Sequence, residues 1–345
     1  MSNESALAPQ AAELVRRVQS RTSPVEIIYR SHELWPLPPP PKCAAPNARR
    51  LPLRISVLDS SFNPPTLAHL ALIRSLPPRE SNVEDYDARL LLLSVRNADK
   101  ALKPGDASYE QRLEMMVRLA HELQSTGSGS ASDPNPPNAA NVAVAIIDEP
   151  TFIRKSSVLR SFLLEHHHTL LRDRGEKEYP VASSTNSQTQ EIQLTFLMGF
   201  DTLERFLAPR YYVPSDPATF SGGNEDAEHF MLAALKTFFA APPTGNGSRV
   251  ICAYRSISSP AGPQIGTVTT DREIAGDNRT ILLAKRFETN QFISFIHLPE
   301  GVGALSSSEV RSRISKELNW KHIVIHEIAL FIEKQSLYVS VATVI

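Results

Sequence analysis

The sequence predicts an α/β fold, a doubly wound (Rossmann-like) parallel sheet with long polar loop insertions. Short apolar runs typical of buried strands recur along the chain, and helical or loop segments separate them. Polar stretches interrupt this pattern, which resumes after each one, so they are predicted to be surface insertions rather than linkers. We therefore expect one domain over residues 51–345, preceded by an N-terminal extension over residues 1–50.

The extension is expected to contain a helix and then a strand. An amphipathic stretch over Ala11–Val18 predicts the helix, and the apolar run Val25–Tyr29 predicts the strand. Prolines between Pro36 and Pro41 then break the pattern before the domain begins.

The domain is expected to contain six strands, each an apolar run of strand length. They are predicted over residues 53–59, 90–95, 142–148, 194–198, 250–255 and 292–297. Helical patterns are predicted over residues 67–73 and 109–123. The polar insertions are predicted over residues 124–141, 180–190, 214–227, 241–248 and 257–280.

Composition excludes several classes of protein. The 36 basic residues nearly balance the 37 acidic ones, so no nucleic-acid partner is expected. Cys43 and Cys252 alone cannot build a disulfide framework or a cysteine zinc site. No apolar run approaches the roughly 20 residues that span a bilayer, and the N-terminus lacks the features of a signal peptide. We expect no membrane partner and a cytoplasmic location; a nuclear location and a homo-oligomer are left open.

The segment Ser60–His69 joins the first strand of the domain to a helix. Such a turn places backbone N–H groups and the positive end of the helix dipole beside an anion. In open α/β sheets, ligands bind at the carboxyl ends of strands, where this turn lies. Thr66 and His69 can both face that anion, and a histidine can donate a hydrogen bond to a phosphate oxygen. The alternative is a capped helix with an incidental surface histidine.

A second segment with similar chemistry lies near the C-terminus. Three serines, Ser306–Ser308, precede a helical run that contains Arg311. Serines at this position are typical N-caps. Exposed amides, serine hydroxyls and an arginine one turn later suit a second anion. The alternative is an ordinary N-cap with a solvated arginine.

The segment Ser61–His69 resembles the signature Gly-Ser-Phe-Asn-Pro-x-Thr-x-x-His of the nucleotidyltransferase superfamily, specifically of the NMN adenylyltransferases and their divergent fungal branch. Ser60 stands where the family usually has glycine, which lets the backbone approach the nucleotide closely. The segment Leu305–Arg311 resembles the family's Ile-Ser-Ser-Thr-x-x-Arg, with Ser308 in the threonine place. Two motifs in the family's order are more specific than either alone. The resemblance also implies a C-terminal helix over residues 323–338.

The resemblance implies a nucleotidyltransferase domain that moves AMP from ATP onto nicotinamide mononucleotide (NMN), giving NAD and pyrophosphate. ATP and NMN are the implied partners. Mg²⁺ is the implied cofactor, bridging phosphates with few protein ligands. The implied catalytic residues are His69, Thr66, Lys103 and Arg311. The implied nucleotide-binding residues are Ser61, Phe62, Gly199, Asp201, Ser307, Ser308 and Arg311.

Three of these assignments depend on supporting segments. Lys103–Arg112 resembles the family's lysine-rich loop and the helix after it; Lys100 is the rival of Lys103, and Ser108 with Gln111 predicts a capping box. Met198–Leu203 resembles the family's Gly-x-Asp-x-Leu, in which Asp201 can also serve as a helix N-cap. Val250–Arg255 resembles a strand that ends in a family arginine.

The acceptor region departs from the family. The family carries a tryptophan that stacks on the pyridine, whereas Phe152 is the aromatic residue here. Because a cationic ring gains from an aromatic face, we expect NMN to be preferred over nicotinate mononucleotide, unless Arg154 pairs with the nicotinate carboxylate.

Two other functions remain open. One is a sister transferase with another phosphorylated acceptor, such as phosphopantetheine. The other is a nucleotide-binding regulator or ATP hydrolase with weak transfer. The run His166–His168 is interpreted as a solvated face rather than a metal site, because consecutive helical residues point in different directions.

Overall fold

Seven strands form one sheet in the computed structural model, which describes residues 4–37, 52–78, 85–96, 103–125, 141–173, 192–213, 224–254, 271–288 and 290–339. Six strands run parallel, and the sheet order is β1-β4-β3-β2-β5-β6-β7. The strands are β1 (Val25–Arg30), β2 (Leu53–Asp59), β3 (Ala88–Ser94), β4 (Val142–Ile147), β5 (Ile192–Gly199), β6 (Arg249–Ala253) and β7 (Ile293–Ile296).

The order of the strands confirms the predicted doubly wound fold. The chain moves outward from β2 through β3 to β4, and then returns to pair β5 with the other side of β2. The direction of winding therefore reverses between β2 and β5, and the adjacent carboxyl ends of these strands leave a crevice there. All six strands predicted in the domain are present within two residues of their expected bounds.

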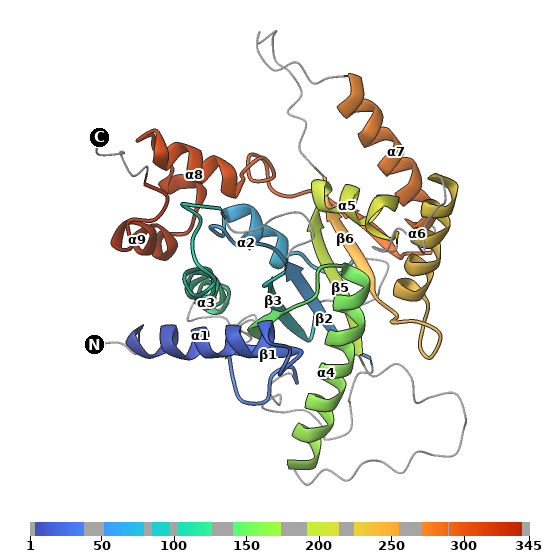
Figure 1. The fold of residues 1–345 in the computed structure, drawn as a ribbon, viewed down its shortest axis with the longest axis horizontal. Helices are drawn as coiled ribbons and strands as arrows, with labels where there is room; N and C mark the ends of the chain where they lie inside the picture. Colours follow the sequence, from blue (N-terminus) through green and yellow to red (C-terminus); the bar gives the residue numbers. More distant parts are fainter. Residues whose placement is uncertain are drawn as a thin grey trace, which may run out of the picture.

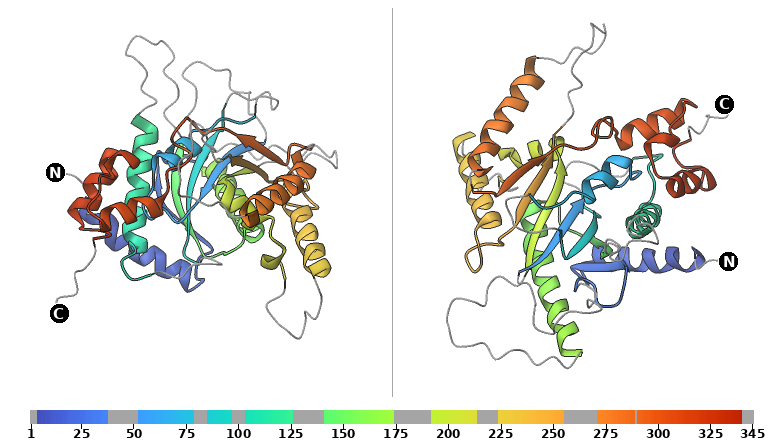
Figure 2. Two further views of the ribbon diagram at one scale, coloured as in Figure 1. Left: turned by 90° about the horizontal axis from the view of Figure 1, so that it is seen from above. Right: turned by 180° about the vertical axis from the view of Figure 1, so that it is seen from behind.

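Helices cover both faces of the sheet (Figure 1). One face carries α1 (Glu4–Gln19), α2 (Leu67–Ile73), α3 (Tyr109–Ser125), α8 (Ser307–Ser315) and α9 (His326–Lys334). The other carries α4 (Phe152–Asp173), α5 (Phe200–Phe206), α6 (Asn224–Phe239) and α7 (Asp271–Glu288). Two short 3₁₀ turns, η2 (Pro209–Tyr211) and η3 (Lys321–Ile323), lie between helices. Figure 2 shows the sheet between these two groups of helices.

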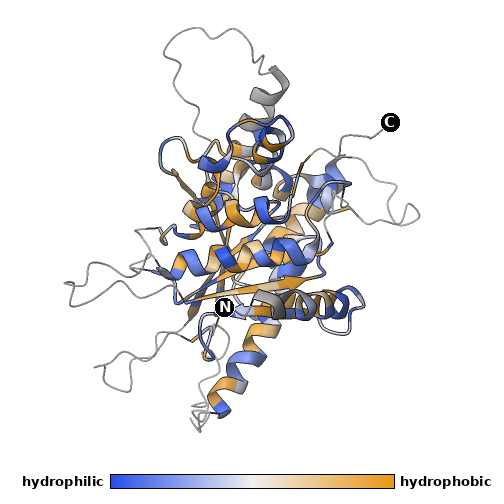
Figure 3. Cartoon of the chain, turned by 90° about the vertical axis from the view of Figure 1, so that its left-hand side faces the viewer, coloured by the Kyte–Doolittle hydropathy of each residue, from blue (hydrophilic) through white to orange (hydrophobic). Residues whose placement is uncertain are grey.

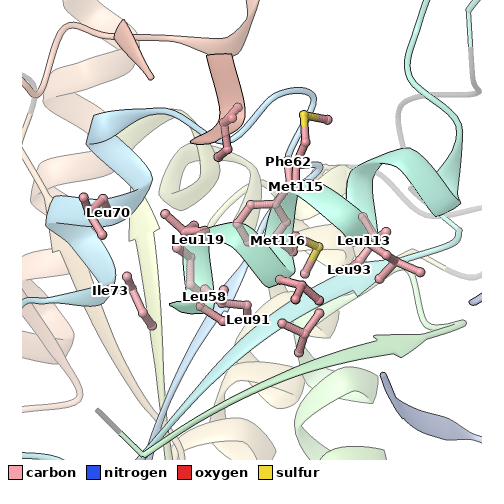
Figure 4. Packing of buried hydrophobic residues seen from close by; sticks show 14 of the residues in the cluster. Leu58, Phe62, Leu70, Ile73, Leu91, Leu93, Leu113, Met115, Met116 and Leu119 are labelled. Atoms are coloured by element: carbon pink, nitrogen blue, oxygen red, sulfur yellow. The ribbon is translucent and has the colours of Figure 1, made fainter. Parts of the chain in front are cut away.

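The central strands are mostly apolar because both of their faces are buried. Leu58 of β2 and Leu91 of β3 pack under α2 and α3, where they meet Ile73 and Leu119 (Figure 4). Val57, the neighbour of Leu58, points to the opposite layer. The strands are accordingly mainly hydrophobic, whereas the helices carry both hydrophilic and hydrophobic residues (Figure 3).

The N-terminal extension contributes to this sheet. As predicted, it forms a helix and then a strand; β1 pairs antiparallel with β4, a direction that the expected parallel sheet did not include. Asn141, just before β4, fixes the chain that follows β1: its buried side-chain amide lies 3.0 Å from the Pro36 carbonyl oxygen, 3.2 Å from that of Leu37 and 2.9 Å from that of Asp87. The extension thus supplies the edge of the sheet.

Some predicted bounds are wrong. The C-terminal helix expected over residues 323–338 is shorter, because Ser336 and Tyr338 take left-handed conformations with φ of 48° and 65° that end it. The expected insertions 214–227 and 257–280 are partly helical, since α6 begins at Asn224 and α7 at Asp271. Residues 126–140, 174–191, 214–223 and 255–270 of the insertions, together with Cys43, Lys100 and Arg255, lie outside the described residues.

No helix in the described ranges is both long and apolar enough to cross a bilayer.

The contacts of Asn141 give a first prediction. Asn141→Ala leaves three buried carbonyl groups without this donor, so we expect the free energy of unfolding to fall by about 1–3 kcal/mol in urea denaturation. Asn319→Ala, at an exposed position, is the matched control and is expected to change it by less than about 0.5 kcal/mol. Equal stability of the two variants would contradict the role given to Asn141.

Candidate functional site

A cleft of about 510 Å³ lies where the winding of the sheet reverses. Its walls come from the segments that follow the carboxyl ends of β2, β3, β4 and β5, and from the loop before α3 and the start of α8. The predicted site residues that line it are Ser61, Lys103, Phe152, Asp201, Ser307, Ser308 and Arg311. The fold therefore brings the two anion motifs and the expected acceptor side chain to one cavity, of a size typical of small-molecule sites.

The turn after β2 is fixed by Asn63, whose side chain is 4% exposed. Its amide nitrogen donates to the Asp106 carboxylate at 2.7 Å. Its amide oxygen accepts the backbone N–H of Ala107 at 3.2 Å and the hydroxyl of Tyr338 at 2.8 Å. The preceding residue, Phe62, has a φ of 46°, so the backbone turns sharply here. Asn63 thus holds the turn between the loop before α3 and the C-terminal segment.

Phe62 is expected to contact a nucleotide, but the structure places it in the hydrophobic core. Its side chain is fully buried and packs in the core with the ring of His69, at 5.4 Å between ring centroids. The whole residue is 0% exposed, and it is not among the residues that line the cleft. Its predicted role in nucleotide binding stays a prediction.

His69 is held by the helix start that the sequence predicts. Thr66 is the N-cap of α2, and His69 stands at the third helical position. The Thr66 backbone N–H donates to His69 Nδ1 at 3.1 Å, and the Thr66 hydroxyl lies 2.9 Å from the same nitrogen. Nδ1 therefore accepts, and the neutral ring carries its proton on Nε2. Burial lowers the pKa of His69 from 6.5 to about 4, so the ring is neutral near pH 7.

Neither His69 nor Thr66 is among the residues that line the cleft. His69 Nε2 instead lies 2.9 Å from the hydroxyl of Ser60, which does line it. The expectation that Thr66 and His69 both face an anion is therefore wrong for the structure as it stands: Thr66 is buried and orients His69, and Ser60 lies between His69 and the cleft.

The second motif contacts the first directly. Ser306 caps α8 by accepting the Glu309 N–H at 3.1 Å, as predicted. Ser307 donates its hydroxyl to the Pro64 carbonyl at 2.7 Å, and Arg311 donates to the carbonyl of Asn63. Arg311 is thus anchored to the first turn while it lines the cleft. The start of α8 and the turn after β2 form one wall.

The loop before α3 adds further charge to this wall. Lys103 is exposed and lines the cleft, and its backbone N–H donates to Asp106 at 3.1 Å. The Asp106 carboxylate lies 3.5 Å from Arg112 and 3.9 Å from Arg311. The predicted capping box is confirmed, because Ser108 and Gln111 exchange hydrogen bonds at 2.8 and 3.3 Å. Two guanidinium groups face one carboxylate, and Lys103 lines the cleft beside them, so this end of the cleft is positive.

The segment after β5 meets the cleft from the other half of the fold. Gly199 is the N-cap of α5, which excludes the N-cap reading of Asp201. Asp201 lies in the first turn of α5 and lines the cleft. A Cβ built on Gly199 would meet no atom within 4 Å, so packing does not require a glycine at this position.

Phe152 begins α4 and lines the cleft as predicted, but it is also part of an aromatic cluster. Its ring meets Phe196 and Phe206 edge-on at 5.6 and 5.7 Å between centroids. The ammonium of Lys155 lies 5.1 Å from the centre of the ring. Arg154, the alternative partner for a nicotinate carboxylate, forms an ion pair with Glu149 at 2.8 Å.

Sequence reasoning missed a buried ion pair in the floor of the cleft. Lys155 Nζ contacts the carboxylate of Asp59 at 2.5 Å, and the two side chains are only 6% and 9% exposed. The sequence contains one signal of this ion pair: the charged residue Asp59 ends the mostly apolar strand β2. The pair places a balanced charge between the positive wall and the aromatic cluster.

The solvated interpretation of the histidine run is wrong in part. His167 is 4% exposed, and His166 contacts the Trp35 carbonyl at 3.0 Å. Within the described ranges, no group of three His, Cys, Asp or Glu side chains could hold a metal ion.

Comparison with known proteins gives one informative match. No family model matches the chain. A protein of Schizosaccharomyces pombe (strain 972 / ATCC 24843) named "Putative nicotinamide mononucleotide adenylyltransferase" is 28% identical over 218 residues, which are 63% of this chain and 57% of that protein. The match thus spans little more than half of that protein's length. It confirms the resemblance to the nucleotidyltransferase superfamily that the motifs predict.

Two solved structures align only loosely. One is described as "Plasmodium falciparum nicotinic acid mononucleotide adenylyltransferase complexed with APC" (14% identity, 83% of this chain and 96% of that chain, TM-score 0.32). The other is a "Putative Nicotinate-nucleotide Adenylyltransferase from Vibrio parahaemolyticus" (12% identity, 83% and 94%, TM-score 0.29). At these TM-scores the alignments support no conclusion, and the fold assignment rests on the strand order.

The pKa of His69 gives a second prediction. The unfolded histidine takes up a proton near pH 6.5, whereas the folded one stays neutral down to about pH 4. The free energy of unfolding should therefore fall as the pH is lowered from about 7 to about 5, because the unfolded state binds more protons there. In His69→Gln this part of the decrease should disappear, while the other histidines contribute equally to both proteins. Identical pH dependence of the two proteins in urea denaturation would contradict the lowered pKa.

Proposed function

We propose that the protein is an adenylyltransferase that moves AMP from ATP onto the phosphate of nicotinamide mononucleotide, forming NAD and pyrophosphate. One observation carries the proposal: the turn after β2 and the start of α8, 243 residues apart at Ser307 and Pro64, meet by hydrogen bonds at one wall of the cleft. Either segment alone is ordinary helix-capping chemistry, whereas the two together suit a polyphosphate. The name of the S. pombe relative supports the same activity.

The positive wall suits the triphosphate of ATP. Lys103 and Arg311 supply charge, and the hydroxyls of Ser307 and Ser308 supply donors at the N-terminus of α8. Mg²⁺ would accompany the nucleotide in this site and would offset part of the charge of its phosphates. The arginine fork and the lysine charge would hold the β- and γ-phosphates, which leave as pyrophosphate.

Catalysis in this scheme is positioning and charge stabilisation, without a covalent intermediate. The mononucleotide phosphate attacks the α-phosphorus of ATP in line, and the β,γ-pyrophosphate departs. The neutral His69 supplies a hydrogen-bond donor on the side of the turn after β2. This donor contacts the hydroxyl of Ser60, which lines the cleft, and a donor in this place would stabilise the negative charge that grows on the α-phosphate oxygens.

The mononucleotide is expected beside Phe152, which lines the same cleft as the start of α8. The Lys155 ammonium already lies near this ring and is balanced by Asp59, so the cation–π gain of a pyridinium ring is smaller than the sequence suggests. The nicotinamide preference instead draws support from the ion pair of Arg154 with Glu149, because Arg154 is the residue that the sequence suggested as a partner for a nicotinate carboxylate.

The third prediction tests the activity itself. Purified protein is incubated with ATP, Mg²⁺ and one acceptor at a time: nicotinamide mononucleotide, nicotinate mononucleotide or phosphopantetheine. We expect dinucleotide and pyrophosphate with the first, and at least about a hundredfold slower turnover in His69→Ala, the loss typical of removing a transition-state donor. Product with phosphopantetheine alone would indicate the sister transferase, and ADP without transfer would indicate an ATP hydrolase. Either result would overturn the proposal.

The fourth prediction concerns Arg311. Arg311→Ala should weaken ATP binding in a calorimetric titration by roughly tenfold or more, the effect of losing a charged hydrogen-bond donor. Arg311→Lys should restore only part of the affinity, because lysine keeps the charge but lacks the planar fork. Arg313→Ala is the matched control, since this arginine of the same helix pairs with Glu309 and does not line the cleft. Equal ATP affinity in Arg311→Ala and Arg313→Ala would contradict the second phosphate site.

A further inference from the structure

Ser60 stands between His69 and the cleft. Its hydroxyl oxygen lies 2.9 Å from His69 Nε2, and the residue lines the cleft, whereas His69 does not. It is half-buried at the carboxyl end of β2, next to Asp59. Any group of the nucleotide that approaches His69 Nε2 from the cleft therefore meets the Ser60 hydroxyl.

The direction of this hydrogen bond follows from the other side of the ring. A backbone N–H can only donate, so the contact from Thr66 makes His69 Nδ1 an acceptor. The proton of the neutral ring is then on Nε2, and Nε2–H donates to the oxygen of Ser60. His69 cannot at the same time remove a proton from Ser60, which excludes a serine nucleophile activated by this histidine.

The O–H of Ser60 is consequently available to another acceptor. With its oxygen accepting from His69, it meets no acceptor in the part of the chain that the structure describes. A hydroxyl whose oxygen accepts a hydrogen bond becomes a better donor, since hydrogen bonds in a chain polarise one another.

We propose that Ser60 is the residue that contacts the α-phosphate, donating its O–H to a phosphate oxygen while its own oxygen accepts Nε2–H from His69. His69 then acts through Ser60 as a positioning residue. This inference rests on the proposed use of ATP. It assigns a role to the position at which this chain departs from the glycine of the family signature. The serine keeps its proton throughout, and no bond to it forms or breaks.

Binding of α,β-methylene-ATP, which carries the α-phosphate but cannot transfer AMP, tests the relay without relying on turnover. We expect Ser60→Ala and Ser60→Gly to weaken binding roughly tenfold in calorimetry, as for one hydrogen bond to a charged acceptor. Ser60→Thr keeps the hydroxyl and should retain most of the affinity. Ser312→Ala, an exposed serine of α8, is the control and should bind like the wild type.

A double-mutant cycle separates the relay from a structural role. If His69 acts through Ser60, His69→Ala should weaken binding in the wild type and add nothing in the Ser60→Ala background. His69→Gln, checked for a native thermal transition, repeats the cycle if the alanine variant is unstable. Additive losses would overturn the relay, because they would mean that His69 reaches the phosphate on its own.

The remaining outcomes distinguish the relay from the proposed function. Equal or tighter binding by Ser60→Gly would overturn the relay and show that the Ser60 side chain obstructs the nucleotide. Weaker binding by Ser60→Ala in a protein that forms no dinucleotide would support the relay and overturn the transferase. Failure of the wild type to bind the analogue would overturn both.

Discussion

The buried amide of Asn63 is the constraint on which the site depends. One side chain joins the turn after β2, the loop that leads into α3 and the segment that follows α9. An amide buried without these partners would lose the hydrogen bonds that compensate its desolvation, so each of the three segments stabilises the place of the other two. Arg311 then attaches α8 to the carbonyl of the same residue. The positive wall of the cleft is therefore assembled around one residue of the turn.

The sequence predicts the sheet well, because parallel strands buried on both faces carry continuous apolar runs that few other structures tolerate. The direction of β1 was not predictable, because an apolar run of strand length does not indicate which strand it will pair with or in which direction. The end of α9 was missed because the residues that take left-handed conformations there are Ser336 and Tyr338. Glycine or asparagine usually marks the end of a helix in this way, and neither occurs here.

Prediction of the site succeeded where local chemistry decides and failed where partners are distant in sequence. The caps at Ser306 and Ser108 depend on residues three positions away, so the motif contains the whole interaction. The Asp59–Lys155 pair and the contact between Ser60 and His69 depend on how the chain folds back. His69 appeared from its spacing to face the ligand directly, whereas the side chain of Ser60 intervenes.

The contact between Tyr338 and Asn63 spans 275 residues, and it has a consequence for how the protein is made. Chains grow from the N-terminus at about 5–20 residues per second, so the turn after β2 waits roughly 14–55 s for Tyr338 to be synthesised. The strands of the first half can pair during that time, but the positive wall of the cleft cannot close. Until Tyr338 has emerged, a nascent chain therefore lacks one of the contacts that hold the turn after β2 in place.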